Sequence, residues 1–186
     1  MKLARSTSIE AVAAAVGQAL QEAGIDAVLT GGACAMIYSA GAYVSYDLDF
    51  IVRRGGTQAT LDAALGAIGF THDHDRYVHA GTDFFVEFPR GPLSIGDDTD
   101  IKPVQLRIGR TTIRALSATD SCRDRLAAFY HWSDRQSLQS AVEIAVRARV
   151  KMAAIRAWSE REGAADKFDE FKTQVAARRK GRGRVR

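Results

Sequence analysis

The sequence contains little cysteine and no long apolar segment. Its two cysteines, Cys34 and Cys122, are far apart and have no partner pattern for zinc, so neither a disulfide nor a zinc site is expected. No apolar run approaches the ~20 residues that cross a bilayer. Residues 1–5 are followed by acidic Glu10 and helical spacing, which argues against a signal peptide. We therefore expect a cytoplasmic protein with no membrane partner.

Outside its C-terminal end the sequence has no excess of positive charge. The formal net charge is +4, but six Lys or Arg residues lie among the last nine, which leaves −2 for residues 1–177. We expect residues 178–186 to be a basic disordered tail. Such a tail suits a nucleic-acid backbone, an acidic partner or a solubilising role equally well.

The order of helical and alternating segments predicts an α/β half followed by a helical half, in a length that suits one compact domain. We place the α/β core at residues 1–116, the helical region at 117–177 and the tail at 178–186. A capping-box spacing at Thr7 and Glu10 starts a helix that Gly24 ends. Further helices are expected at 31–39 and 57–68, and strands at 25–30, 43–52, 77–79, 84–88, 104–108 and 111–116. From Ser117 the pattern is helical, with breaks near 132–134 and at Gly163.

Asp47 and Asp49 are the first candidate functional residues. Alternation in 43–52 places both carboxylates on one face of a strand and Leu48 and Phe50 on the other. Side chains two residues apart on a strand are about 7 Å apart, which lets hard oxygen ligands share divalent ions. Mg²⁺ binds through a few carboxylates together with water and substrate phosphates. Most Asp-x-Asp pairs are ordinary solvent-facing residues, so this pair needs support from other residues.

Gly31 and Gly32 supply that support. They lie between the expected buried strand and the helix 31–39, where bare backbone amides can approach a phosphate and the helix N-terminus favours its negative charge. The alternative is a tight strand-to-helix turn that needs a positive φ.

The ordered set of motifs resembles the nucleotidyltransferase superfamily, which has a polymerase-β-like fold. Its members carry a helix-opening Gly-Gly or Gly-Ser, a strand with Asp-x-Asp, and a third carboxylate on a later strand, here Gly31-Gly32, Asp47-Leu48-Asp49 and Glu87. Residues 30–33 followed by 45–50 are most similar to AbiEii-type toxins and related orphan bacterial nucleotidyltransferases. The resemblance spans roughly residues 25–145 and implies an α/β (α+β) fold with a mixed sheet flanked by helices, followed by a C-terminal helical region.

Glu87 and Asp83 compete for the place of the third carboxylate. Glu87 lies among apolar residues of the expected strand 84–88, where an unpaired charge is costly and needs a partner such as a metal. Asp83 shares its face by alternation, but its position after Gly81 and Thr82 favours a turn. Many members of the superfamily have Asp at this place. We assign the third position to Glu87.

The resemblance also implies which residues contact the nucleotide. Thr30, Gly31, Gly32 and Ser45 belong to the matching motifs. Arg125 and Arg135 lie in helical segments that resemble the superfamily's Lys-leucine-alanine segment and its Arg-Asp pair, and Arg can bind phosphate bidentately. The alternative is a solvated helix face with charge pairs one turn apart.

Together these residues predict a nucleotidyltransferase. Asp47, Asp49 and Glu87 would be both catalytic and metal-binding residues and hold one or two Mg²⁺, with Mn²⁺ as the other suitable ion. The partners would be an NTP and an acceptor hydroxyl on RNA or tRNA, and the AbiEii resemblance implies a toxin with an antitoxin protein. A protein or small molecule such as an aminoglycoside is another acceptor class. The alternative function is a catalytically silent module that binds nucleotide, RNA or a partner protein.

Overall fold

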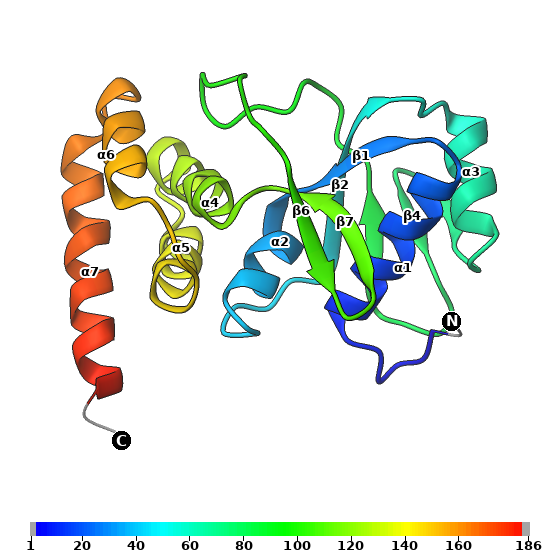
Figure 1. The fold of residues 1–186 in the computed structure, drawn as a ribbon, viewed down its shortest axis with the longest axis horizontal. Coiled ribbons are helices and arrows are strands. Elements are labelled where there is room, and N and C mark those ends of the chain that lie inside the picture. The colour runs from blue at the N-terminus through cyan, green and yellow to red at the C-terminus, as the bar shows by residue number, and fades with distance from the viewer. Residues whose placement is uncertain (1–2, 184–186) are drawn as a thin grey trace.

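The computed structural model describes residues 3–183 and contains a seven-stranded mixed sheet with helices around it (Figure 1). Helices α4–α7 lie together at one end of the molecule, at left in Figure 1, and α2 lies between them and α1. The helices are α1 (Ile9–Glu22), α2 (Gly31–Tyr38), α3 (Gln58–Gly66), α4 (Ala118–Trp132), α5 (Arg135–Arg147), α6 (Met152–Arg161) and α7 (Ala165–Gly183). The strands are β1 (Asp26–Leu29), β2 (Asp47–Arg54), β3 (Thr71–Asp73), β4 (Arg76–Val78), β5 (Phe85–Glu87), β6 (Val104–Ile108) and β7 (Thr111–Ala115).

Strand β2 lies in the middle of the sheet and carries the acidic pair. The strand order is β3-β4-β5-β2-β1-β7-β6. Strand β2 runs antiparallel to β1 and parallel to β5, and its register with β5 places Asp47 opposite Phe85 and Asp49 opposite Glu87. The mixed sheet expected from the sequence is therefore present.

Alternation along β2 separates the core from the opposite face of the sheet. Leu48 and Phe50 are buried, whereas Asp47 and Asp49 are only half-buried. Full burial of a side chain such as Leu48 contributes about 1.5–3 kcal/mol relative to exposure. A slip of one residue in register would reverse this arrangement and place the carboxylates in the core. The apolar positions of α1 add to the same core at helical spacing, through Ile9, Val12, Val16 and Leu20.

Helix α4 connects the sheet to the helical end. Its N-cap, Ser117, accepts a hydrogen bond from the Asp120 amide at 3.0 Å, as the sequence predicts. The buried guanidinium of Arg123 pairs with Asp98 and Asp120, and it lies 5.0 Å from the ring centroid of Trp158. Because Asp98 belongs to the long β5–β6 connection, this network ties the connection to α4 and α6.

The prediction of a disordered tail at residues 178–186 is wrong for residues 178–183, because helix α7 continues through them. Arg178 forms an ion pair with Glu143 of α5 at 2.6 Å, and Arg179 donates to the Ala145 carbonyl at 2.7 Å. Contacts with α5 therefore hold basic residues that composition alone assigns to a flexible end. Residues 184–186 of the predicted tail lie outside the described residues.

Two further boundaries differ from the prediction. Strand β2 begins at Asp47 rather than at residue 43, because its partner β5 starts at Phe85, opposite Asp47. Helices α5 and α6 are separated at residues 148–151, where no glycine or proline marks a break; the Lys151 amide there donates to the Thr119 hydroxyl at 3.0 Å. The other predicted helices and strands are present, shifted by a few residues at most.

In residues 3–183 no helix combines the length and apolarity needed to cross a bilayer. Cys34 and Cys122 are buried free thiols.

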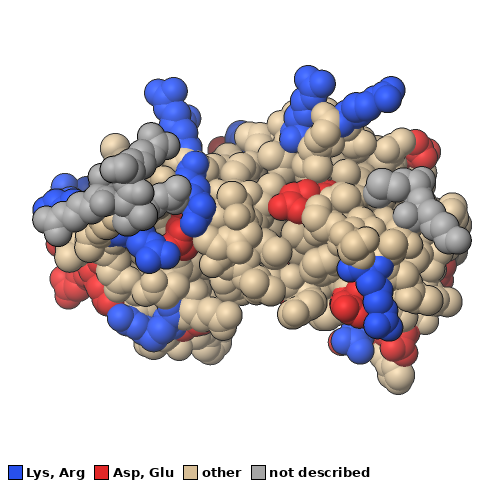
Figure 2. All heavy atoms as spheres, turned by 90° about the horizontal axis from the view of Figure 1, so that it is seen from below, with Lys and Arg blue, Asp and Glu red and all other residues tan. Residues whose placement is uncertain are grey.

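On the face shown in Figure 2, several Lys and Arg side chains surround the helical end, and a separate acidic patch lies near the middle.

Candidate active site

Three carboxylates lie on one face of β2 and β5. Asp49 and Glu87 are opposite each other in the parallel register, and Asp47 faces the same side two residues earlier. Neighbouring strands are about 4.8 Å apart, so the side chains of Asp49 and Glu87 are adjacent. Asp83 is exposed and precedes β5, outside this row. The fold brings together the three carboxylates that the sequence singled out.

The row is electrostatically crowded. Burial raises the pKa of Asp49 to about 6, and the negative charges of Asp47 and Glu87 add to the effect. The pKa of Glu87 is also raised, first by burial and then by Asp47 and Asp75, while Arg76 acts in the opposite direction. Accumulated negative charge of this kind favours binding of a proton or a cation.

Gly31 leaves space for the Asp49 carboxylate. Gly31 has a φ of +63°, and a Cβ at this position would lie 2.0 Å from Asp49 Oδ2. A side chain here would therefore need both a strained backbone and displacement of the carboxylate. The structure supports the positive-φ turn that was the alternative explanation for this glycine, and adds that the carboxylate lies against the start of α2.

Gly32 leaves space for Ser45. A Cβ at position 32 would lie 2.2 Å from Ser45 Oγ. The buried Ser45 hydroxyl donates a hydrogen bond to Asp47 Oδ1. Ser45, predicted to bind nucleotide, thus holds the Asp47 carboxylate in place.

The N-terminus of α2 has no side-chain cap. Thr30 occupies the N-cap position, but its hydroxyl donates to the Asp49 carbonyl at 3.4 Å instead of accepting from a helix amide. The Thr30 amide donates to the same carbonyl at 2.9 Å. Because Thr30 leaves the first amides of α2 without a cap, the positive end of the helix dipole is available to an anion beside the carboxylate row.

Arg125 of α4 lies near the row, whereas Arg135 of α5 does not contact it. The Arg125 guanidinium donates twice to Asp124 Oδ2, at 3.1 and 2.6 Å. Burial acts against its charged form, but Asp124, Tyr43 and Asp49 outweigh burial and raise the pKa of Arg125. Arg135 forms an ion pair with Glu170 of α7 at 2.6 Å.

Two residues near the row were not singled out by the sequence. Arg76 of β4 is opposite Glu87 in the antiparallel register, and its guanidinium lies 4.9 Å from the Phe85 ring centroid. Tyr43, in the α2–β2 connection, is close enough to Arg125 to affect its pKa. The hairpin signal at residues 71–78 could have indicated Arg76, but its register with β5 is a tertiary property.

A pocket adjoins the α2–β2 connection. It has a volume of about 380 Å³ and lies between residues 42–44 and the helices α5 and α7. Its polar lining comes from Gln136, Gln139, Ser140, Glu143 and Arg178. The lining includes Val44, which directly precedes Ser45, but it contains none of the carboxylates Asp47, Asp49 and Glu87.

The donor set suits a hard divalent cation that substrate completes. Within residues 3–183, no three His, Cys, Asp or Glu side chains form a ready metal-binding group by themselves. Mg²⁺ requires less than this, because it binds through one or two carboxylates and fills its octahedron with water and phosphate oxygens. Asp47, Asp49 and Glu87 provide oxygen donors on one face. Burial, and after it the neighbouring carboxylates, raises the pKa values of Asp49 and Glu87, and a cation would offset the repulsion between these charges.

Comparisons with known proteins bear on the fold. The sequence matches no protein-family model and no curated protein. Among solved structures, the chain is similar to an antigenic nucleotidyltransferase-like protein from Paracoccidioides brasiliensis, with a TM-score of 0.54 and 17% identity over 76% of this chain and 77% of that chain. The chain has a nucleotidyltransferase-like fold. The antibiotic-resistance factor ANT(2'')-Ia aligns over 95% of this chain and 94% of its own, at 12% identity and a TM-score of 0.49; the fold assignment rests on the first structure alone.

Proposed function

We propose that the protein transfers a nucleotide from an NTP to an acceptor hydroxyl. The observation that carries this proposal is the register of β2 and β5, which aligns Asp49 with Glu87 beside the uncapped start of α2. A carboxylate row next to a helix N-terminus provides both parts of a site for a cation-bound triphosphate.

Each residue has a defined task in this reaction. Asp47, Asp49 and Glu87 would hold one or two Mg²⁺, which would neutralise phosphate charge when bound. The first amides of α2, at Gly31 and Gly32, face the β- and γ-phosphates, and Arg125 adds positive charge on the side of α4.

The chemical step is an in-line displacement. The acceptor oxygen forms a bond to the α-phosphorus, and the bond from that phosphorus to the bridging oxygen breaks, so pyrophosphate leaves with the bonding electrons. The acceptor proton passes to a carboxylate oxygen of the row formed by Asp47, Asp49 and Glu87.

We propose RNA, including tRNA, as the acceptor class. The pocket beside residues 42–44 provides the side-chain amides of Gln136 and Gln139, which suit base edges, whereas its Arg178 guanidinium is paired with Glu143 of the same lining. A role as the toxin of a toxin–antitoxin pair rests on the sequence resemblance around Asp47 and Asp49 and on no feature of the fold.

Transfer of an α-phosphate label tests the function. The purified protein is incubated with each NTP, Mg²⁺ and separate pools of RNA, protein and small hydroxylated molecules. We expect label on one pool, loss of transfer in Asp49→Asn and Glu87→Gln, and retained transfer in the matched control Asp83→Asn, which alters an acid outside the row. Binding of NTP without transfer to any pool would instead support a silent nucleotide-binding module.

A further inference from the structure

Helices α6 and α7 enclose an apolar groove away from the carboxylate row. The groove has a volume of about 420 Å³. Phe168 and Val175, both buried, form its floor, together with the half-buried Met152 and the exposed Ala153 and Ala176. None of these residues belongs to the proposed nucleotide site. The groove can therefore accept an apolar side chain without involving that site.

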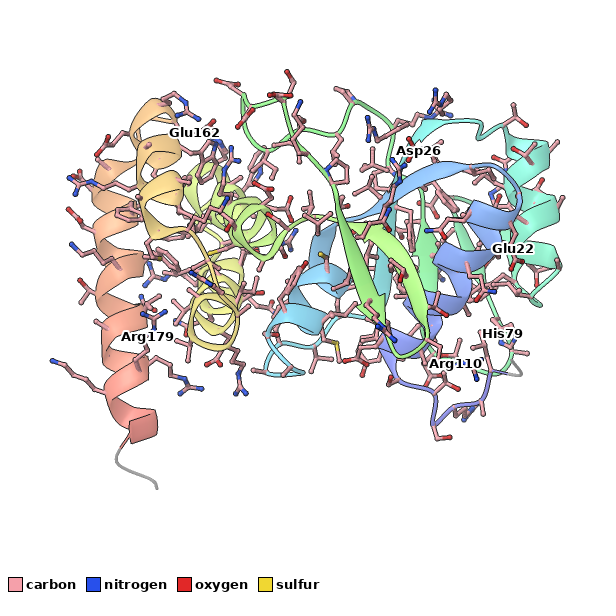
Figure 3. The ribbon with its side chains drawn as sticks, in the orientation of Figure 1. Glu22, Asp26, His79, Arg110, Glu162 and Arg179 are labelled. Atoms are coloured by element: carbon pink, nitrogen blue, oxygen red, sulfur yellow. The ribbon has the colours of Figure 1, made fainter. Side chains whose placement is uncertain are left out.

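The edges of this groove are positively charged. Arg156, Lys172 and Arg179 complete its lining. Arg156 pairs with Glu160 at 2.9 Å, and Arg179 extends from α7 toward α5 to reach the Ala145 carbonyl (Figure 3). No carboxylate of residues 3–183 forms an ion pair with Lys172. The lining contains three Lys or Arg and no Asp or Glu, so the groove favours a negatively charged partner.

We propose that the groove binds an acidic amphipathic helix of another protein. The apolar face of such a helix inserts a side chain over Phe168 and Val175, and its flanking Asp or Glu residues pair with Lys172 and Arg156. The apolar floor and the positively charged edges of the groove together select this partner. RNA shares the negative charge, but its bases stack on exposed aromatic rings, and the only ring in this lining, Phe168, is buried. The same groove of a second copy would bring like charges together. The proposal is independent of nucleotidyl transfer.

Fluorescence anisotropy with a labelled peptide tests the proposal. The probe is a peptide of about 15 residues, long enough for marginal helix formation, with Leu at helical spacing and Glu elsewhere. Two control peptides have Lys in place of Glu or the same composition with Leu scattered around the helix. We expect saturable binding of the first peptide alone. Affinity should fall about tenfold or more in Ala153→Trp, which fills the groove, and about fivefold in Lys172→Glu.

Matched variants separate the groove from other surfaces. Ala154→Trp adds the same ring at an exposed neighbouring position outside the groove lining and should leave peptide affinity unchanged, as should Asp49→Asn. Equal binding by the Ala153→Trp and Ala154→Trp variants would overturn the proposal. So would tighter binding of a labelled RNA oligonucleotide that Ala153→Trp abolishes, or a wild-type dimer that Ala153→Trp converts to monomer, because the occupant would then be RNA or a second copy.

Discussion

Asp49→Asn should stabilise the protein while abolishing its proposed activity. In the folded state burial and the neighbouring carboxylates raise the pKa of Asp49 from the ordinary 3.8 to about 6. This shift corresponds to about 3 kcal/mol of folding free energy. The folded state binds the Asp49 proton more tightly than the unfolded state does. The stabilisation that this proton gives the folded state is fully present below pH 3.8 and is lost as pH rises through about 6. At pH 7 the ionised carboxylate therefore lowers stability, and a neutral Asn removes that penalty.

Urea unfolding at two pH values measures the effect. At pH 7 we expect the free energy of unfolding of Asp49→Asn to exceed that of wild type by about 1–3 kcal/mol, and near pH 4 the difference should shrink below about 1 kcal/mol. Asp98→Asn is a control of opposite sign. Its hydrogen bond from Arg123 lowers the pKa of Asp98, so this variant should be less stable than wild type at pH 7.

The result that refutes this reasoning is an Asp49→Asn variant no more stable than wild type at pH 7. It would mean that burial and the neighbouring carboxylates do not raise the pKa of Asp49 in the folded protein. Addition of Mg²⁺ extends the test, because an ion that binds only the folded state raises the unfolding free energy. Wild type should gain more from Mg²⁺ than Asp49→Asn does.

Three further changes probe the neighbouring structure. Gly31→Ala should lower the unfolding free energy measured in urea by more than about 2 kcal/mol, since the positive φ alone costs about 1–2 kcal/mol and the new Cβ would lie 2.0 Å from Asp49 Oδ2. In an Asp49→Ala background most of the cost beyond that of the positive φ should vanish. Equal costs of Gly31→Ala in both backgrounds would contradict the clash. Arg125→Lys keeps the charge but loses bidentate geometry, so kcat/KM for the NTP in the label-transfer assay should fall about tenfold. Arg135→Lys should retain activity. The reverse pattern would indicate that the triphosphate binds beside α5 instead. Arg123→Ala leaves two carboxylates without their partner and should cost about 3–5 kcal/mol in a urea titration, and a loss under about 1 kcal/mol would show that the network does not hold the β5–β6 connection.

Much of the fold follows from local sequence rules. Glycines at positive φ end α1 and begin α2, and Ser117 starts α4 where its side chain caps the helix. These signals operate within a few residues, so a single sequence reveals them. The break between α5 and α6 has no such local signal.

The candidate site likewise has one part that local sequence rules predict and one part that depends on tertiary structure. Alternation along residues 47–50 by itself determined that Asp47 and Asp49 share a face opposite Leu48 and Phe50, because side chains on any strand alternate. The position of Glu87, rather than Asp83, beside Asp49 depends on how β5 pairs with β2. Register is set by packing of the whole sheet and not by residues adjacent in sequence.

Contacts between distant segments decided the remaining features. Arg125 lies near Asp49 because α4 packs against α2, and residues 178–183 are helical where α7 contacts Glu143 and Ala145 of α5. The sequence by itself determined most of the element types and the faces of the strands, which depend on backbone geometry over a few residues. The tertiary structure alone decided which charges meet, because those distances depend on how elements far apart in the chain pack together.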